Sequence, residues 1–420
     1  MLLGAVADDL TGVTDLSLML AREGMRTVQV VGVPDRDFDF GNAQAVVVAL
    51  KSRTIPANEA VQQSRRAVEA LLAAGAEQIV FKYCSTFDST SQGNIGPVAE
   101  ALLDLLREPL TIACPAFPAN KRTIYKGHLF VGDQLLSDSP MKDHPLTPMR
   151  DANLVRVLQA QTGLPVGLVE YDVVRQGAAA IAWAFKDALA RGERMLVVDA
   201  ITDDDLREIG SVAAGMKLIT GGSGIAIGLP ENFRKAGKLQ APEGGTALVA
   251  PDGKAVILAG SCSTATRRQI EAAQEAGLQS FKIDPVDVNS GEISVEGVLA
   301  WMKGVHGIPL IYSSAEPDAV RNEQAMLGRE RAGAIIEHFL GELAVRLRGE
   351  GYRRFLVAGG ETSGAVVAAL GVKAMRIGPE IDPGVPWTLS LGDAEPLALA
   401  LKSGNFGADD FFIRAWDLLR

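Results

Sequence analysis

The chain has 420 residues with 47% hydrophobic content, so it is longer than one typical core and ordinary in composition for a globular protein. Its formal net charge is −10, and no cluster of Lys and Arg is long enough to follow a nucleic-acid backbone. No apolar run approaches membrane-spanning length. The chain contains only three, widely spaced cysteines, and its start lacks the features of a signal peptide. These features predict a cytoplasmic protein without disulfides and without nucleic-acid or membrane partners.

Short apolar segments alternate with helical patterns through the first half of the chain. Leu2–Ala7, Ala45–Leu50 and Gln78–Lys82 have the composition of strands buried on both faces, and Ala57–Ala74 has the periodicity of an amphipathic helix. This alternation is typical of a parallel sheet flanked by helices. Further strands of the same character are expected at Thr27–Val31, Leu110–Ala113, Met195–Asp199 and Lys217–Thr220, and a further helix at Gly96–Arg107.

The character of the sequence changes between Asn232 and Lys254, where Gly, Pro and Lys are frequent. This composition predicts a linker with a short irregular strand. The alternation of strands and helices then restarts at Ala255–Ala259. We therefore predict an α/β protein of two domains, 1–240 and 250–420, each a mostly parallel sheet flanked by helices. A cleft between two such domains commonly holds an active site for two substrates, and we expect one here.

Residues 115–150 interrupt this rhythm with five prolines and no long periodic element. A segment of this length in a compact domain is usually functional or disordered. We predict an ordered flap over the site of the first domain; the alternative is a β-hairpin without substrate contact. The flap contains His144, the one histidine that we consider a functional candidate, since the four histidines of the chain are too scattered to hold a metal ion.

Two aspartates follow the first predicted strand in the motif ADDLTG at 7–12. The carboxyl ends of buried parallel strands are where α/β proteins bind ligands, so Asp8 and Asp9 are candidates for a general base or an anchor for substrate hydroxyls. The structural alternative is that Asp9 or Thr11 caps the helix that follows.

Polar residues also follow two other strands of the first half, in KSR at 51–53 and KYCSTFDST at 82–90. Arg and Lys at these strand ends suit a carboxylate ligand, and hydroxyls with a further carboxylate suit a polyhydroxy substrate. Each could instead be a satisfied turn residue. The candidate substrate-binding residues are Arg53, Lys82, Ser85, Thr86, Asp88 and Ser89.

Three turns rich in glycine and hydroxyl residues follow strands of the second half. They are AGSCSTAT at 259–266, LVAGGETSG at 356–364 and KSGNFG at 402–407. A strand, a glycine turn and a helix N-terminus together form an anion site, and we expect the anion to be a nucleotide phosphate. An ordinary strand-to-helix turn is the alternative. Neither the Walker pattern nor GxGxxG after a strand is present, so backbone and hydroxyl donors would hold the phosphates.

The chain resembles the four-carbon acid sugar kinase family, and within it the 3-oxo-tetronate 4-kinases. The resemblance rests on ADDLTG, FKYCSTFDST, AGGETSG and LALKSGNFG, together with LKSRTIP at 50–56, GNIGP at 93–97, FVGDQLLSDSPMKDHPLTPM at 130–149, SSAEP at 313–317 and IDPGVPW at 381–387. It implies an N-terminal substrate domain, a C-terminal nucleotide domain and ATP-dependent phosphorylation of the 4-hydroxyl of a 3-oxo-tetronate. The nucleotide contacts that it implies fall on Ser261, with Ser263 as the competing serine, and on Gly359, Gly360, Glu361, Thr362 and Gly404.

For the reaction we expect Mg²⁺ to bridge the phosphates without a dedicated protein site. We expect Asp9, or failing that Asp8, to accept the proton of the hydroxyl that is phosphorylated. The resemblance leaves open a D-threonate or related tetronate 4-kinase, and it does not decide whether the protein forms a homo-oligomer. Two interpretations of other classes are a haloacid-type phosphatase, whose DxDxT spacing does not fit here, and a sugar-acid binder without enzymatic activity.

Overall fold

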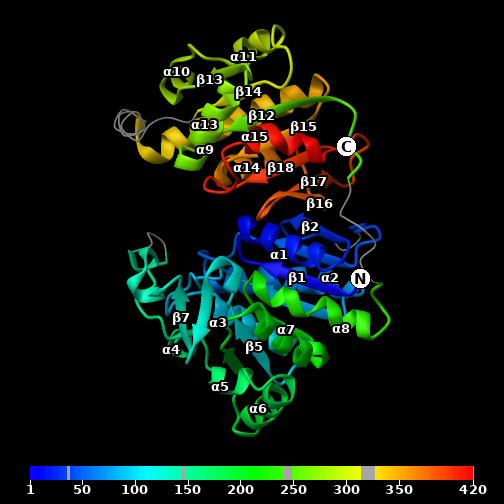
Figure 1. Ribbon diagram of the computed structural model, residues 1–420, viewed down its shortest axis with the longest axis vertical. Coiled ribbons are helices and arrows are strands. Elements are labelled where there is room, and N and C mark those ends of the chain that lie inside the picture. Colours follow the sequence, from blue (N-terminus) through cyan, green and yellow to red (C-terminus); the bar gives the residue numbers. More distant parts are fainter. Residues whose placement is uncertain (36–37, 144–146, 241–247, 314–326, 420) are drawn as a thin grey trace. The chain divides into compact units, whose positions relative to one another are not determined.

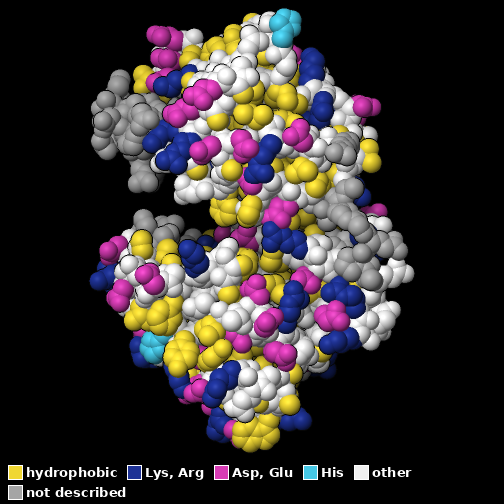
Figure 2. Space-filling model, in the orientation of Figure 1, with side chains coloured by type: hydrophobic (Ala, Val, Ile, Leu, Met, Phe, Trp, Pro, Cys, Tyr) yellow, Lys and Arg dark blue, Asp and Glu magenta, His cyan; other side chains and the backbone are white. Residues whose placement is uncertain are grey.

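A computed structural model describes residues 1–35, 38–143, 147–240, 248–313 and 327–419. The chain divides into two compact units, Met1–Gly244 and Gly245–Arg420 (Figure 1). His144 of the predicted flap and residues 314–317 of the SSAEP motif fall outside the described residues. In the described part of the chain, no helix is both long enough and apolar enough to cross a membrane. On the face drawn in Figure 2, acidic and basic side chains are interspersed rather than gathered by sign.

The first unit is built on a parallel sheet with the strand order β2-β3-β1-β4-β11-β5-β10-β9. The strands consist largely of Val, Ile, Leu and Ala, and β1 is buried along its whole length because strands pair with it on both sides. Their bounds are Leu3–Ala7 (β1), Thr27–Val31 (β2), Ala45–Ala49 (β3), Gln78–Lys82 (β4), Thr111–Cys114 (β5), Val166–Val169 (β9), Met195–Val198 (β10) and Leu218–Gly221 (β11).

Helices pack against this sheet in two groups. α1 contacts β2 and β3 and also η5 (Ser223–Gly228), which in turn contacts α7, whereas α2 packs on β1 and against α3. The helices are α1 (Leu10–Arg22), α2 (Ala57–Ala73), α3 (Ile95–Leu106), α4 (Leu154–Gln159), α5 (Tyr171–Val174), α6 (Ala178–Ala190), α7 (Asp203–Val212) and α8 (Pro230–Lys235). The expectation of a linker from residue 232 is therefore wrong at its start, because α8 extends to Lys235. Residues 248–253 contain no strand.

Residues 115–150 contain a small antiparallel sheet of β6 (Arg122–Tyr125), β7 (His128–Val131) and β8 (Gln134–Leu135). Asp199, at the end of β10, anchors the β6–β7 turn by accepting hydrogen bonds from the backbone N–H groups of Lys126 and Gly127, at 2.6 and 2.8 Å. A third N–H, from Tyr171, donates to the same carboxylate at 2.8 Å. The segment is thus a β-hairpin excursion held to the end of a core strand.

The second unit contains a mixed sheet with the order β13-β14-β12-β15-β18-β17-β16. The first five strands are parallel, whereas β17 and β16 run antiparallel to their neighbours. The strands are β12 (Lys254–Ala259), β13 (Ser280–Lys282), β14 (Leu310–Tyr312), β15 (Tyr352–Ala358), β16 (Ala374–Asp382), β17 (Val385–Ser390) and β18 (Ala398–Lys402). The α/β class with mostly parallel sheets is confirmed.

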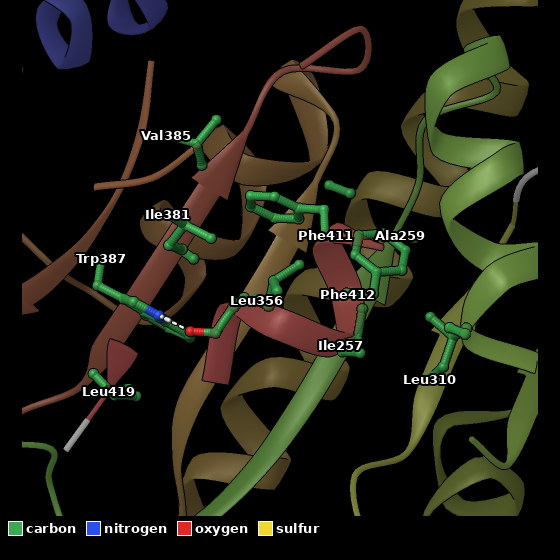
Figure 3. Packing of buried hydrophobic residues seen from close by; sticks show 14 of the residues in the cluster. Ile257, Ala259, Leu310, Leu356, Ile381, Val385, Trp387, Phe411, Phe412 and Leu419 are labelled. Carbon is green, nitrogen blue, oxygen red and sulfur yellow. Dashed lines mark hydrogen bonds between the residues drawn. The ribbon is translucent and has the colours of Figure 1, made fainter. Parts of the chain in front are cut away.

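The core of the second unit joins its sheet to its C-terminal helix (Figure 3). Trp387 is fully buried, and its indole N–H donates to the backbone oxygen of Ala415 at 2.7 Å, so a large apolar side chain is buried with its polar atom satisfied. The helices are α9 (Thr264–Glu275), α10 (Pro285–Ser290), α11 (Val295–Met302), α13 (Arg329–Gly349), α14 (Gly360–Ala369) and α15 (Phe411–Arg414).

Candidate active site

In the first unit, the predicted polar residues follow three neighbouring strands, β3, β1 and β4. Because these strands are parallel and in register, with Ala7 beside both Ala49 and Lys82, their carboxyl ends meet at one edge of the sheet. The backbone continues this pairing for one more step, since the N–H groups of Ser52 and Arg53 both donate to Asp8 O. Residues that are about 45 and 75 positions apart in the sequence are thereby brought together.

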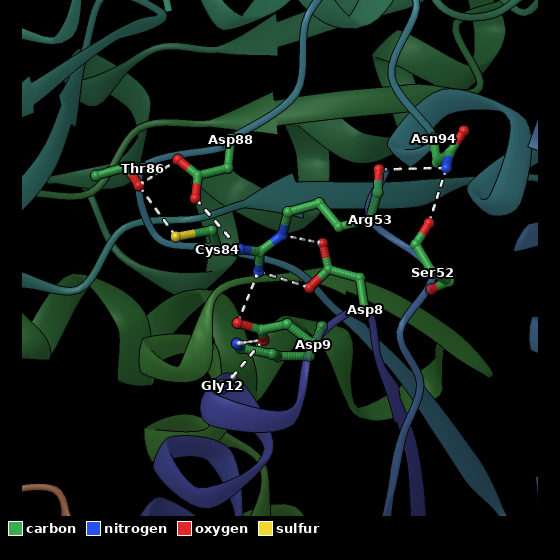
Figure 4. A network of polar contacts seen from close by, with 10 residues as sticks. Asp8, Asp9, Gly12, Ser52, Arg53, Cys84, Thr86, Asp88 and Asn94 are labelled. Atoms are coloured by element: carbon green, nitrogen blue, oxygen red, sulfur yellow. Dashed lines mark hydrogen bonds and ion pairs between the residues drawn. The ribbon is translucent and has the colours of Figure 1, made fainter. Parts of the chain in front are cut away.

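Arg53 is the centre of this arrangement (Figure 4). Its Nε and Nη2 donate to the two carboxylate oxygens of Asp8, each at 2.9 Å, which is a bidentate pair. Its Nη2 also lies 3.1 Å from Asp9 Oδ2, and its Nη1 donates to Asp88 Oδ2 at 3.3 Å. The guanidinium of Arg53 therefore contacts three carboxylates. Its Nε and Nη2, which could together bind a substrate carboxylate, already donate to Asp8.

Asp9 has the structural role that the sequence left as an alternative. Its Oδ1 accepts from the N–H of Gly12 at 3.0 Å, so it is the N-cap of α1. The same oxygen lies 3.4 Å from Nζ of the buried Lys82. With a side chain that is 28% exposed, against 7% for Asp8, it is the more accessible of the two carboxylates.

The two aspartates differ in their electrostatics. Burial raises the pKa of Asp8, and the contacts with Arg53 do not fully offset it. Burial alone would also raise the pKa of Asp9, but Lys82 and Arg53 outweigh it and lower that pKa. Of the two aspartates, Asp9 is therefore the one whose surroundings favour the ionised form. Burial raises the pKa of Asp15, one turn along α1, to about 6.

The turn after β4 has an uncommon backbone. Phe87 and Asp88 have φ values of 65° and 42°, a left-handed conformation that non-glycine residues rarely adopt. This turn directs Asp88 to Arg53, and Thr86 Oγ1 donates to the other Asp88 oxygen at 2.8 Å. Thr86 also lies 3.0 Å from the sulfur of Cys84, whose pKa burial raises to about 11.

Ser85 and Ser89 lie apart from the Arg53 contacts. Ser85 is half-buried, and Ser89 Oγ accepts from Gln161 Nε2 at 2.9 Å. The N–H of Ser89 donates to the sulfur of Met149, at the end of the predicted flap, at 3.3 Å. A pocket of about 270 Å³ opens beside these residues, lined by Ser89, Thr90, Ser91, Pro148, Met149, Arg150, Asp151, Arg156, Val157 and Ala160.

Asn94 was missed as a member of this site, although it lies in the motif GNIGP. Its Nδ2 donates to the backbone oxygens of Ser52 and Ile55, both at 2.8 Å, and so fixes the loop that carries Arg53. No local pattern in the sequence could indicate this, because the two partners are about 40 residues away. The glycines of GGSG at 221–224, by contrast, serve packing. A Cβ at Gly221 would lie 2.3 Å from the backbone oxygen of Cys114.

In the second unit, the three glycine turns follow β12, β15 and β18, which are adjacent and parallel. The three turns lie so close together that a side chain would not fit at the glycines where they meet. A Cβ at Gly260 would lie 2.1 Å from Thr362 Oγ1, and one at Gly404 would lie 2.5 Å from Ser261 Oγ. Gly359 has φ 128°, and a Cβ on this residue would crowd the same threonine at 2.9 Å. The glycines are thus required by the close approach of the turns.

The two serines of the first turn differ in their contacts. Ser263 is the N-cap of α9, and its hydroxyl donates to Gly404 O at 2.6 Å. Ser261 Oγ accepts from the N–H of Ser263 at 3.2 Å, and its own hydroxyl proton has no acceptor within the described part of the chain. α14 begins at Gly360, with Gly359 as an N-cap that offers no side chain, so the first N–H groups of this helix are not capped by a side chain. Glu361 and Gly360 lie on the exposed surface of this first turn.

Lys402 and Thr266 were also missed as site residues. Lys402 ends β18 directly before the glycine turn, and its Nζ donates to Thr266 Oγ1 at 3.1 Å and to Gly404 O at 2.9 Å. A lysine as the last residue of an otherwise apolar strand is the signal that could have identified it.

Comparisons with known proteins agree with this division into units. Residues 3–229 match the family model described as a sugar-binding N-terminal domain, and residues 256–412 match the one described as a nucleotide-binding C-terminal domain. The chain is thus a two-domain α/β protein whose parts match a sugar-binding and a nucleotide-binding family model. The chain belongs to this family, and its resemblance to the four-carbon acid sugar kinases is confirmed.

Two similar relatives carry the name 3-oxo-tetronate kinase. The protein of Cupriavidus necator is 58% identical over 419 residues, and that of Pseudomonas fluorescens is 55% identical over 415 residues. Each alignment covers 99% of this chain and 96% of the relative. Among solved structures, a Haemophilus influenzae protein is 42% identical with a TM-score of 0.89, covering 99% of this chain and 100% of that one.

Proposed function

We propose that this protein is an ATP-dependent kinase that phosphorylates the 4-hydroxyl of a 3-oxo-tetronate. The observation that carries the proposal is the convergence of three glycine turns at adjacent strand ends in the second unit, beside a free serine hydroxyl and an uncapped helix N-terminus. The name shared by relatives more than half identical over nearly the whole chain supports the substrate.

The second unit would bind the triphosphate through backbone N–H groups. The first turn of α14, from Gly360 to Thr362, presents N–H donors at the positive end of a helix dipole, whereas the N–H of Gly359 donates to the backbone oxygen of Lys402. Ser261 is the better candidate than Ser263 for a hydroxyl contact, because the hydroxyl of Ser263 is engaged by Gly404. No group of His, Cys, Asp or Glu suited to a metal ion occurs among the described residues, so Mg²⁺ would be held mainly by the phosphates.

The first unit would hold the sugar acid next to Asp9. Asp9 is ionised and partly exposed, so it can accept the proton of the 4-hydroxyl while that oxygen attacks the γ-phosphorus of ATP. Thr86, Asp88, Ser85 and Ser89 offer groups for the remaining hydroxyl and oxo oxygens. Because Asp8, Asp9 and Asp88 surround Arg53, we propose that Arg53 orients these carboxylates and does not grip the substrate carboxylate with its fork.

A coupled assay of ADP release tests this proposal. Purified protein with Mg²⁺ and ATP is offered 3-oxo-tetronates of the D and L series, D-threonate and other tetronates, and the product is located by mass spectrometry and NMR. A 4-phosphate formed fastest from a 3-oxo-tetronate is the expected result. A faster reaction with D-threonate or another tetronate would reassign the substrate. Phosphate release from sugar-acid phosphates without ATP, or sugar-acid binding without any nucleotide effect on thermal stability, would reject the kinase.

A further inference from the structure

Lys402 is a fully buried lysine beneath the glycine turns of the second unit. It is the last residue of the otherwise apolar strand β18, and it is 0% exposed. The ammonium group donates three hydrogen bonds, to Thr266 Oγ1 at 3.1 Å, Ser403 O at 3.1 Å and Gly404 O at 2.9 Å. All of its donors are therefore used, and two of the acceptors belong to the turn that carries Gly404.

These partners are neutral, so they satisfy the hydrogen bonds of Lys402 without neutralising its charge. No described carboxylate forms an ion pair with it, whereas Lys82, the buried lysine of the first unit, lies 3.4 Å from Asp9. A buried charge without a counter-charge is unfavourable. Burial accordingly lowers the pKa of Lys402 to about 8.

The charged groups on the neighbouring elements do not supply the missing negative charge. The elements that pack on β18 are β15, β17 and α14, and α9 contributes Thr266. β17 carries no charged residue, and the turn before α9 contains the titratable thiol of Cys262. The other charged residues on these elements are Arg353 and Arg354 on β15, Glu361 on α14, and Arg267, Arg268, Glu271 and Glu275 on α9. None of these groups is a cause of the lowered pKa of Lys402, which comes from burial.

The hydrogen bonds of Lys402 lead directly to the proposed phosphate-binding turns. Gly404 O accepts from both Lys402 Nζ and Ser263 Oγ, and Ser263 N–H in turn donates to Ser261 Oγ. The ammonium of Lys402 thus lies behind the glycine turns, whose own hydrogen-bond donors are uncharged. The chain has no Walker lysine that could reach a phosphate in its place.

We propose that Lys402 is the fixed positive charge of the nucleotide site, and that the phosphates of a bound nucleotide provide its missing counter-charge. Lys402 is a positioning residue. It acts on the nucleotide indirectly, through its hydrogen bond to the turn at Gly404 and through its electrostatic field. This inference rests on the proposed function, since it takes the second unit as the nucleotide site. A nearby anion favours the protonated amine, so nucleotide binding is coupled to proton uptake by Lys402.

Calorimetry of Mg²⁺–ADP binding at pH 8, in buffers of different ionisation enthalpy, measures this uptake. A lysine with a pKa near 8 is about half protonated there, so we expect uptake of about 0.5 proton per nucleotide bound. In Lys402→Met this uptake is lost, and ADP affinity falls about tenfold or more because the buried positive charge behind the turn is gone. The matched control Lys373→Met, at an exposed position of the same unit, should behave like the wild type, and Cys262→Ser should retain the uptake.

The outcomes separate this inference from the proposed function. Absence of ADP binding by the wild-type protein would reject the nucleotide site itself. Tight ADP binding without proton uptake at pH 8 would overturn the role of Lys402 alone, as would a folded Lys402→Met that binds ADP like the wild type. If Lys402→Met does not fold, Lys402→Arg tests the inference, because an arginine stays charged at pH 8 and should bind ADP without proton uptake; uptake by this variant would overturn it.

Discussion

Replacement of Arg53 by methionine is the most informative perturbation of the first unit. Methionine retains much of the length of the side chain but removes the guanidinium that contacts Asp8, Asp9 and Asp88 at 2.9 to 3.3 Å. Lys82 then remains as the single cation facing Asp9 in this network. Asp8 suffers most, because it is 7% exposed and loses two hydrogen bonds at once.

The size of the effect follows from burial. One carboxylate about 4 Å from a cation interacts by about 4 kcal/mol at an effective dielectric constant of 20. Removal of one partner of a buried ion pair usually costs about 3–5 kcal/mol, because the other charge stays buried without compensation. We therefore expect Arg53→Met to lower the free energy of unfolding of the first unit by about 3–5 kcal/mol at pH 8.

The loss of folding stability in Arg53→Met should become smaller as the pH falls. Burial already raises the pKa of Asp8 above its unfolded value, and removal of Arg53 raises it further. The folded state of the variant then binds a proton more tightly than the unfolded state, so its stability improves as the pH falls through that raised pKa. The destabilisation at pH 5.5 should accordingly be smaller than at pH 8.

Hydrogen exchange followed by mass spectrometry is the suitable assay, because peptides from β1 and β3 report on the first unit alone. A loss of about 3–5 kcal/mol accelerates exchange of their most protected amides by about 10²- to 10⁴-fold. The control is Arg65→Met, at an exposed position of α2, which should change stability by less than about 0.5 kcal/mol. A loss below about 1 kcal/mol, or an equal loss at both pH values, would refute the assignment of Arg53 as the cation that stabilises these buried carboxylates.

Three further predictions concern single residues. Asp9→Asn should lower kcat by about 10²- to 10⁴-fold in a protein that still folds, because asparagine caps α1 equally well but cannot accept the proton; unchanged turnover would remove Asp9 as the base. Gly360→Ala, where nothing lies within 4 Å, should preserve the fold but weaken ATP binding in a fluorescence titration, whereas Gly349→Ala, equally open, should affect neither. Asp15→Asn should be more stable than the wild type at pH 7.5 by up to about 3 kcal/mol, because burial raises the Asp15 pKa to about 6; urea unfolding should show the difference disappear below about pH 4, and a constant difference would contradict it.

Local sequence patterns were sufficient to predict seven of the eight strands in the parallel sheet of the first unit, all but β9, and the positions of the polar turns. β2 and β4 have the bounds that their apolar runs predicted, because a short run of Val and Ile between turn residues has few other stable conformations. The antiparallel strands β16 and β17 were not predicted, since their composition resembles neither a continuous apolar run nor a regular alternation. The start of α8 was hidden for a similar reason, in a stretch whose glycines and lysines favoured a linker.

Side-chain partners, in contrast, were decided by the tertiary structure alone. The sequence placed Arg53 at a strand end, but only the parallel register of β3 and β1 engages its fork with Asp8, and only the left-handed turn at Asp88 adds a third carboxylate. Likewise, the sequence did not distinguish Lys402 from the other lysines, and only the structure shows that it is buried at the end of β18 beside Thr266. The physical reason is that propensity is local, whereas the burial of a charge and the identity of its partner depend on residues far away in the chain.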